Sequence, residues 1–322
     1  MKRVKVSAPG KVILSGEHAV VYGKPEIIVA INRRLGVTVK ELESASRSLV
    51  FSSQEPSGLL EFAVKKVFKI LGKHPKKPLE IRVDSEIPIG SGLGSSAALA
   101  VATTASLFKF FNQTFDKERI NEIAYEIEKK QHGVPSGGDN TIVTHGGFLW
   151  YRKEAEFLKL FEPLQFNSNE LPEFVLINTG RPQETTGEMV AAVKYLYNRN
   201  KKKVEKFLNE IEKVTRQMLI ALNRNEKKKI MSAIKKNEQL LEELEVVGPF
   251  AKKVIKEIER KGGVAKICGA GGKKKGSGIL LAFHSRKEVI FELAKKCNLP
   301  AFEVKLGEEG VKVEEDTLQN NG

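Results

Sequence analysis

Residues 88–98 read Pro-Ile-Gly-Ser-Gly-Leu-Gly-Ser-Ser-Ala-Ala, and small or apolar residues continue to Phe111. Glycines let a backbone approach an anion closely, and the unpaired N–H groups at a helix N-terminus favour phosphate. For a lone glycine triplet, a tight turn capped by serine is the simpler interpretation. Here the ordered glycines end in two serines at the start of an apolar helix, a pattern that predicts a loop for nucleotide phosphates.

This glycine-rich stretch differs from the two commoner phosphate-binding loops. A P-loop requires G-x-x-x-x-G-K-[ST], and no lysine follows a glycine at that spacing. A dinucleotide fingerprint requires G-x-G-x-x-G, but Gly90 and Gly92 are followed by Ser95 at the third position. The chain therefore uses another kind of phosphate loop.

Three further motifs make a family resemblance specific. Residues 8–23 read APGKVILSGEHAVVYG, residues 132–140 read HGVPSGGDN, and residues 266–272 read KICGAGG. In this order and spacing, together with residues 88–98, they resemble the GHMP kinases, which include galactokinase and the homoserine, mevalonate and phosphomevalonate kinases. The resemblance covers nearly the whole chain. The first and second motifs are most similar to those of the members that phosphorylate mevalonate.

The resemblance implies an α+β, two-domain GHMP-kinase-like fold with the nucleotide in a cleft between the domains. The N-terminal ATP-binding domain, a mixed α/β unit, is expected over residues 1–170. The C-terminal domain, with an antiparallel sheet and helices, is expected over residues 171–322. We place the boundary in the polar stretch around residues 167–172, ahead of an apolar segment typical of a strand.

Hydrophobic periodicity and turn residues predict the individual elements. The expected helices span residues 58–73, 97–111, 116–130 (capped by Thr114 or Asp116), 188–224 and 226–245 (two or three helices), 249–262 and 287–296. The expected strands span residues 4–7, 37–40, 49–51, 79–83, 147–151, 174–177, 265–268, 278–283 and 301–306, with a frayed end at 319–322.

Composition indicates a soluble globular protein. The 322 residues are 41% hydrophobic and 29% charged, and no apolar run approaches the ~20 residues of a membrane span. The N-terminus lacks the apolar segment of a secretory signal, so we expect a cytoplasmic location. Cys268 and Cys297 form no metal-binding pattern, and we expect both to be reduced and to pack in the core.

The net charge is +14, and three lysine runs contribute to it, at residues 201–203, 227–229 and 273–275. Nucleic-acid binding is one interpretation, but aromatic residues are not interleaved with the runs. The first two runs fit solvated helix faces, and anionic substrates offer a use for a positive field. The third run stands where the family usually continues with glycines and often a cysteine. It is expected either near a phosphate or on a solvated loop tip.

The resemblance assigns roles to residues that would be unremarkable alone. Asp139 would be a turn or cap residue, Lys11 a surface lysine and Glu128 a surface glutamate. By the family pattern, Asp139 is the general base, Lys11 assists it, and Ser96 and Glu128 bind Mg²⁺. The expected ATP-binding residues are Pro88, Gly90, Gly92, Leu93, Gly94, Ser95, Ser96 and Ala97. The expected substrate-binding residues are Glu17, His18, Ser136, Gly137, Thr185 and Gly271.

The reaction implied by the resemblance is transfer of the γ-phosphoryl group of Mg-ATP to the 5-hydroxyl of mevalonate. Two alternatives remain open: another GHMP small-molecule kinase, such as a phosphomevalonate kinase or a mevalonate 3-kinase, and a non-catalytic binding protein on the same fold. The expected partner is the small-molecule substrate, with no nucleic acid or membrane partner, and a homodimer is left open.

Overall fold

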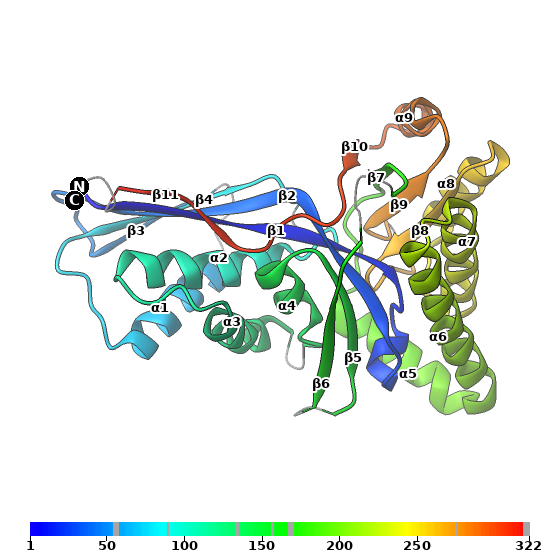
Figure 1. Ribbon diagram of the computed structural model, residues 1–322, viewed down its shortest axis with the longest axis horizontal. Helices are drawn as coiled ribbons and strands as arrows, with labels where there is room; N and C mark the ends of the chain where they lie inside the picture. The colour runs from blue at the N-terminus through cyan, green and yellow to red at the C-terminus, as the bar shows by residue number, and fades with distance from the viewer. Residues whose placement is uncertain are drawn as a thin grey trace.

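The computed structural model describes residues 1–53, 58–88, 90–132, 135–155, 158–166, 171–274 and 276–317, without the side chains of 131 and 132. Gly133, Val134, Lys275 and the expected frayed end therefore lie outside the described residues. The molecule is elongated, and the start of the first strand lies beside the end of the last described strand at one tip of a long sheet (Figure 1). A block of helices around a smaller sheet forms the other end.

The long sheet has the order β11-β1-β2-β4-β3, with β5 paired to β2 and β6 paired to β5. Its strands are β1 (Arg3–Ser15), β2 (Glu26–Glu41), β3 (Leu49–Ser53), β4 (Leu79–Ser85), β5 (Phe148–Lys153), β6 (Lys159–Leu164) and β11 (Lys312–Asp316). Neighbouring strands are antiparallel, except that β3 and β4 are parallel. β1 is much longer than the predicted 4–7 because a register shift between Pro9 and Gly10 lets it continue into the second block.

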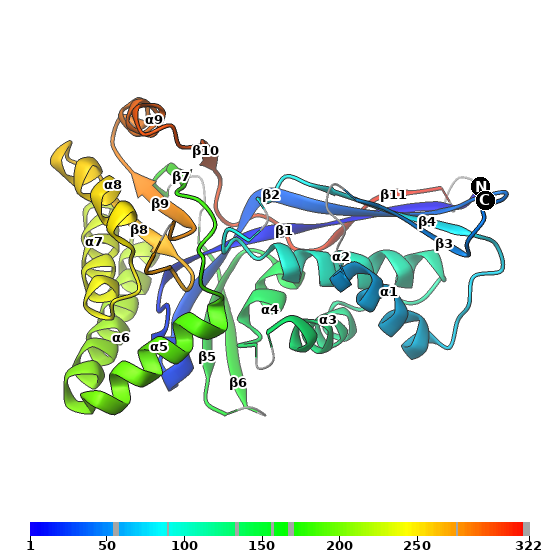
Figure 2. The same ribbon diagram turned by 180° about the vertical axis from the view of Figure 1, so that it is seen from behind.

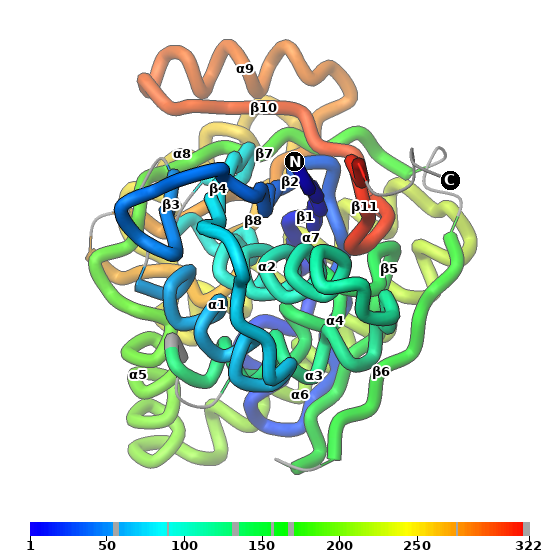
Figure 3. Tube along the Cα trace, turned by 90° about the vertical axis from the view of Figure 1, so that its left-hand side faces the viewer, coloured from blue at the N-terminus to red at the C-terminus, as the bar shows by residue number. Residues whose placement is uncertain are grey.

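Four helices cover one face of this sheet: α1 (Gly58–Leu71), α2 (Ser95–Phe110), α3 (Lys117–His132) and α4 (Gly138–His145). Figure 3 shows them end-on, all on the same side of β1 and β2. α2 is buried nearly all round, as its apolar sequence predicts. The cap expected for α3 is confirmed at Asp116, whose Oδ1 accepts the backbone N–H groups of Glu118 and Arg119.

The second sheet is antiparallel, as expected, with the order β10-β7-β9-β8. Its strands are β7 (Phe174–Asn178), β8 (Val264–Cys268), β9 (Ile279–Phe283) and β10 (Ala301–Val304). The accompanying helices are α5 (Thr186–Arg199), α6 (Lys201–Asn223), α7 (Lys227–Glu243), α8 (Pro249–Arg260) and α9 (Lys287–Lys296). Figure 2 shows α5 crossing from this block towards the helices of the first.

The last strand bears on domain organisation. β11 returns from the second block to pair with β1, so the chain's last strand lies in the first sheet. The division at residue 170 stays a prediction.

Within the described residues, no helix combines the length and apolar character needed to span a bilayer. Cys268 is buried as expected, whereas Cys297 is only partly so, and both are free thiols.

Candidate active site

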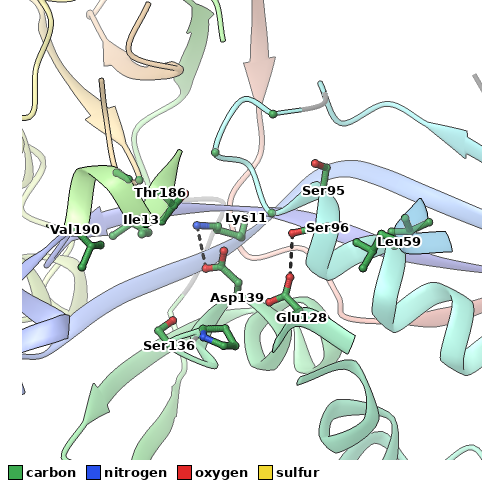
Figure 4. Close-up of a pocket in the computed structure, with 18 of the residues that line it drawn as sticks. Lys11, Ile13, Leu59, Ser95, Ser96, Glu128, Ser136, Asp139, Thr186 and Val190 are labelled. Carbon is green, nitrogen blue, oxygen red and sulfur yellow. Dashed lines mark hydrogen bonds and ion pairs between the residues drawn. The ribbon is translucent and has the colours of Figure 1, made fainter. Parts of the chain in front are cut away.

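A cavity of about 1050 Å³ opens where β1, the glycine-rich loop, α3, α4 and the start of α5 converge. Figure 4 shows its centre, with side chains from both halves of the chain pointing into it. Two pairs of interacting side chains lie near the middle. Their positions follow from the elements that carry them.

The glycine-rich loop takes a conformation that favours glycine. Gly90, Gly92 and Gly94 have φ of 67°, 85° and 76°, the left-handed region. A Cβ at Gly94 would lie 2.8 Å from Cγ of Lys11, and one at Gly92 would lie 2.9 Å from the carbonyl oxygen of Cys268. Gly94 also precedes α2 without any side-chain cap on the helix, which leaves its first N–H groups for an anion.

The expected ATP-binding residues divide into two groups. Those that line the cavity are Gly90, Gly92, Gly94, Ser95 and Ser96. Leu93 and Ala97 are buried, and the carbonyl of Leu93 accepts the N–H of Lys11 at 2.9 Å. Pro88 accepts a hydrogen bond from the hydroxyl of Ser91 at 2.6 Å. Pro88, Leu93 and Ala97 therefore support the conformation of the loop and do not line the cavity.

Lys11 and Asp139 form the first pair. Nζ of Lys11, on β1, lies 3.0 Å from Oδ1 of Asp139, in the first turn of α4. Lys11 is almost fully buried, whereas the Asp139 side chain is 37% exposed and so remains accessible from the cavity. Burial works against the charge of Lys11, but Asp139 outweighs it, and the pKa of Lys11 is raised. The lysine is therefore a fixed positive charge beside an accessible carboxylate.

Ser96 and Glu128 form the second pair. The hydroxyl of Ser96, at the start of α2, donates to Oε1 of Glu128 on α3 at 2.9 Å. Burial, followed by the nearby charge of Asp139, raises the pKa of Glu128 to about 7. A hydroxyl and a carboxylate are hard oxygen donors of the kind that Mg²⁺ accepts, usually with phosphates and water completing its coordination. These residues fit a magnesium ion.

Glu26 is a site residue that the motifs did not indicate. It starts β2, is 2% exposed and lines the cavity. Burial, then the charge of Asp139, raises its pKa well above the ordinary value. Glu26 is therefore a buried carboxyl with a raised pKa close to the Lys11–Asp139 pair. No sequence signal marks it, because only the pairing of β1 with β2 places it there.

Glu17 and His18 also line the cavity, and both are held by protein groups. The carboxylate of Glu17 accepts hydrogen bonds from Nζ of Lys266 and, at 3.0 Å, from Nδ2 of Asn237. Nε2 of His18 donates to the carbonyl of Ala270 at 3.0 Å. Burial lowers the pKa of His18 to about 4, so the ring is neutral at pH 7.

The other expected substrate-binding residues differ in position. Ser136 lines the cavity, where Figure 4 shows it near Asp139. Gly137 precedes α4, with a φ of 94°. Thr185 caps α5 in a reciprocal pair with Glu188, and the residues after it, Thr186 and Gly187, line the cavity instead. Gly271 packs against the carbonyl of Val246, while its neighbours Gly269 and Ala270 face the cavity.

The described lysines of the third run lie outside the cavity lining. Nζ of Lys273 is 3.4 Å from Oε2 of Glu245, and both side chains are exposed. Lys274 is exposed as well. Of the two expected positions for the run, these lysines occupy the solvated loop tip.

A phosphate loop, a lysine–carboxylate pair and an oxygen-ligand pair around one cavity define a phosphotransferase acting on small molecules. Comparison with known proteins gives the same class. The GHMP kinases N terminal domain matches residues 59–147. Mevalonate kinase of Archaeoglobus fulgidus is 40% identical over 272 residues, covering 83% of this chain and 88% of the relative. Mevalonate kinase of Methanothermobacter thermautotrophicus is 33% identical, and the match covers 83% of this chain and 86% of the relative. The chain therefore belongs to the GHMP kinase family and is a small-molecule kinase.

Solved structures share the fold. Mevalonate kinase of Methanococcus jannaschii superposes with a TM-score of 0.78 at 24% identity, covering 94% of this chain and 98% of that one. L. major mevalonate kinase in complex with R-mevalonate superposes with a TM-score of 0.82 at 21% identity, and the match covers 95% of this chain and 96% of that one. The expected GHMP-kinase fold is confirmed.

Proposed function

We propose that this kinase transfers the γ-phosphoryl group of ATP to the 5-hydroxyl of mevalonate, giving phosphomevalonate and ADP. The substrate is taken from the relatives named above, which match most of the chain. The observation that carries the chemistry is the 3.0 Å contact between Nζ of Lys11 and Oδ1 of Asp139. It gives a base and a fixed positive charge at the same point of the cavity.

Asp139 is suited to accept the proton of the substrate hydroxyl. The hydroxyl oxygen forms a bond to the γ-phosphorus, the bond to the β–γ bridging oxygen breaks, and ADP leaves with that electron pair. Lys11 orients the carboxylate and stabilises the negative charge that develops on the transferring group. Ser96 and Glu128 would hold Mg²⁺, which supplies charge neutralisation on the phosphates when bound.

The two ends of the cavity have different linings, one suited to ATP and the other to mevalonate. Leu59, Leu60 and Leu99 supply apolar surface at one end, suited to the adenine base. At the other end are Ile13 and Val190, on the far side of Lys11 from Leu59 (Figure 4). These residues suit the small branched carbon skeleton of mevalonate, with Ser136, Thr186 and His18 as polar contacts. Asp139 lies between the two ends, where the phosphoryl group would pass.

The alternatives make different use of the same cavity. A phosphomevalonate kinase would need a cation for the substrate's own phosphate. The described lysines of the third run do not line the cavity, but Lys130, Lys153 and Arg181 do, so the lining alone does not choose between the two substrates. A non-catalytic binder has no need of a carboxylate kept accessible beside a buried lysine. The accessible carboxylate favours a kinase over a binder, and the relatives favour mevalonate as its substrate. Mg²⁺ dependence, a cytoplasmic location and a homodimer also stay predictions.

The decisive experiment is a coupled assay of ADP release over mevalonate, phosphomevalonate, homoserine and galactose. NMR of the product then locates the new phosphate. We expect turnover with mevalonate and phosphate on the 5-oxygen. Preferred turnover of phosphomevalonate, or phosphate on the 3-oxygen, would assign a different member of the family. A lack of turnover with every alcohol would support the binding protein.

A further inference from the structure

Arg181 lies against the phosphate loop in the cavity lining. It follows β7 and lines the cavity together with Gly90. A Cβ at Gly90 would lie 2.9 Å from Nε of Arg181 and 3.3 Å from its Cζ. The guanidinium can therefore lie on the loop because residue 90 has no side chain.

Arg181 is an exposed cation. Among the described residues, no hydrogen bond or ion pair is formed by its guanidinium, whereas Lys11 and Lys273 each pair with a carboxylate. A guanidinium presents a planar fork of donors that matches phosphate oxygens. An exposed guanidinium against the phosphate loop, without a partner in the described part of the chain, is placed to bind an anion there.

Hydrogen bonds hold the backbone immediately before Arg181. Asn178 accepts the N–H of Gly180 at 2.9 Å, and Gly278 donates to the carbonyl of Gly180 at 3.1 Å. The Thr179 hydroxyl donates to the carbonyl of Gly278 at 2.7 Å. Pro182 further restricts Arg181 to extended conformations.

We propose that Arg181 binds the phosphates of the nucleotide beyond the first, reaching them from the second half of the chain. The same segment continues to Thr186, which lines the cavity together with Lys11. The contact with Gly90 puts the guanidinium on the phosphate loop itself, which is why we assign it to phosphates rather than to the base. The inference rests on ATP as phosphoryl donor and not on which alcohol receives the group.

The test compares nucleotides that differ only in their phosphates. Dissociation constants of ATP, ADP and AMP are measured by calorimetry, with Mg²⁺, on the full-length chain and on its Arg181→Gln variant. We expect ATP and ADP to bind about tenfold more weakly to the variant, as for loss of a solvent-accessible charge-assisted hydrogen bond. AMP should bind within about twofold of the unaltered chain, and added salt should narrow the difference for ADP.

Arg224→Gln is the matched control, because Arg224 is an exposed arginine at the end of α6, outside the cavity lining. It should leave all three constants unchanged. If Arg181→Gln weakens the binding of AMP as much as that of ADP, Arg181 only packs against the loop. If the variant binds ADP as tightly as the unaltered chain, Arg181 contacts no phosphate beyond the first. Either result overturns the proposal. If mevalonate is not turned over but the ADP–AMP difference is found, only the proposed substrate fails.

Discussion

Lys266 and Glu17 form an ion pair that is shut off from solvent, with side chains 0% and 1% exposed. Lys266, on β8, also donates to the carbonyls of Ile13 at 3.0 Å and Ile267 at 2.7 Å. The pair thereby ties the second sheet to the end of β1. His18, which follows Glu17, lines the cavity directly beyond this junction.

Breaking this pair should destabilise the protein strongly. In Lys266→Met the carboxylate of Glu17 stays buried with Asn237 as its remaining partner, and loss of one member of a buried pair costs about 3–5 kcal/mol. Urea unfolding measures the free energy of unfolding. Lys266→Met with Glu17→Gln should recover part of the loss, because no charge is then left buried. A single variant as stable as the unaltered chain would contradict the importance of the pair.

Asp139→Asn should preserve folding and nucleotide binding but lower kcat by ~10²–10⁴, the usual contribution of a general base. Steady-state kinetics on mevalonate, with ADP binding as a check on folding, measure this. Asp84→Asn is the control, since Asp84 pairs with Arg82 on the face of β4 away from the cavity. A near-normal kcat in Asp139→Asn would leave positioning and Lys11 as the means of activating the alcohol.

Of the four central residues, Lys11, Ser96 and Asp139 stand in motifs, whereas Glu128 lies outside them and was assigned by the family resemblance alone. Lys11, Ser96, Glu128 and Asp139 come from separate segments, and the structure brings them together in two contacts. For the substrate positions the motifs were less exact: Thr185 and Gly271 shape the backbone, and their neighbours face the cavity.

Other features required tertiary structure. Glu26 and Arg181 have no motif, and they reach the site only through strand pairing and the packing of loops from both halves. The length of β1 was missed because its second half is buried on both faces, which removes the alternation that identifies a strand. α4 was missed because glycine and threonine in its sequence are weak helix formers.

Ser96→Ala and Glu128→Gln should each raise the Mg²⁺ concentration needed for half-maximal activity and lower kcat, since each removes an oxygen donor. Mg²⁺ titrations at saturating ATP measure the change. Glu126→Gln is the control, because Glu126 lies on the same helix and pairs with Lys129 on its exposed side. Titrations that coincide with those of the unaltered chain would show that the metal is held elsewhere.

Replacing Lys273 and Lys274 together by alanine should change KM for ATP by no more than about twofold, because exposed ion pairs contribute little and neither lysine lines the cavity. The comparison is made at low salt, where a phosphate contact would be most evident. Arg181→Gln, measured in parallel, should raise KM. A clear rise in KM for the lysine variant would mean that the loop closes over the phosphates during catalysis.

Glu238 makes the stability of the protein depend on pH. It lies on α7, 2% exposed, and its Oε2 accepts the N–H of Ile267 at 2.9 Å. Its Oε1 has no partner among the described residues. Burial raises the pKa of Glu238 from the ordinary 4.5 to about 8, against the opposing effects of that hydrogen bond and Lys266. The folded protein therefore keeps a proton on Glu238 at pH values where the unfolded chain has lost it.

The sign of the pH effect follows from this difference. Between pH 4.5 and about 8 the folded state binds more protons than the unfolded state, so the free energy of unfolding falls as pH rises, by at most about 5 kcal/mol. Glu238→Gln, which carries no titrating proton, should flatten the profile and gain stability relative to the unaltered chain as pH rises towards 8. Urea unfolding at intervals from pH 5 to 8 measures both profiles. Glu243→Gln, an exposed substitution on the same helix, should follow the unaltered chain. Parallel profiles for Glu238→Gln and the unaltered chain would show that Glu238 is ionised in the folded protein, with Lys266 close enough to hold its charge.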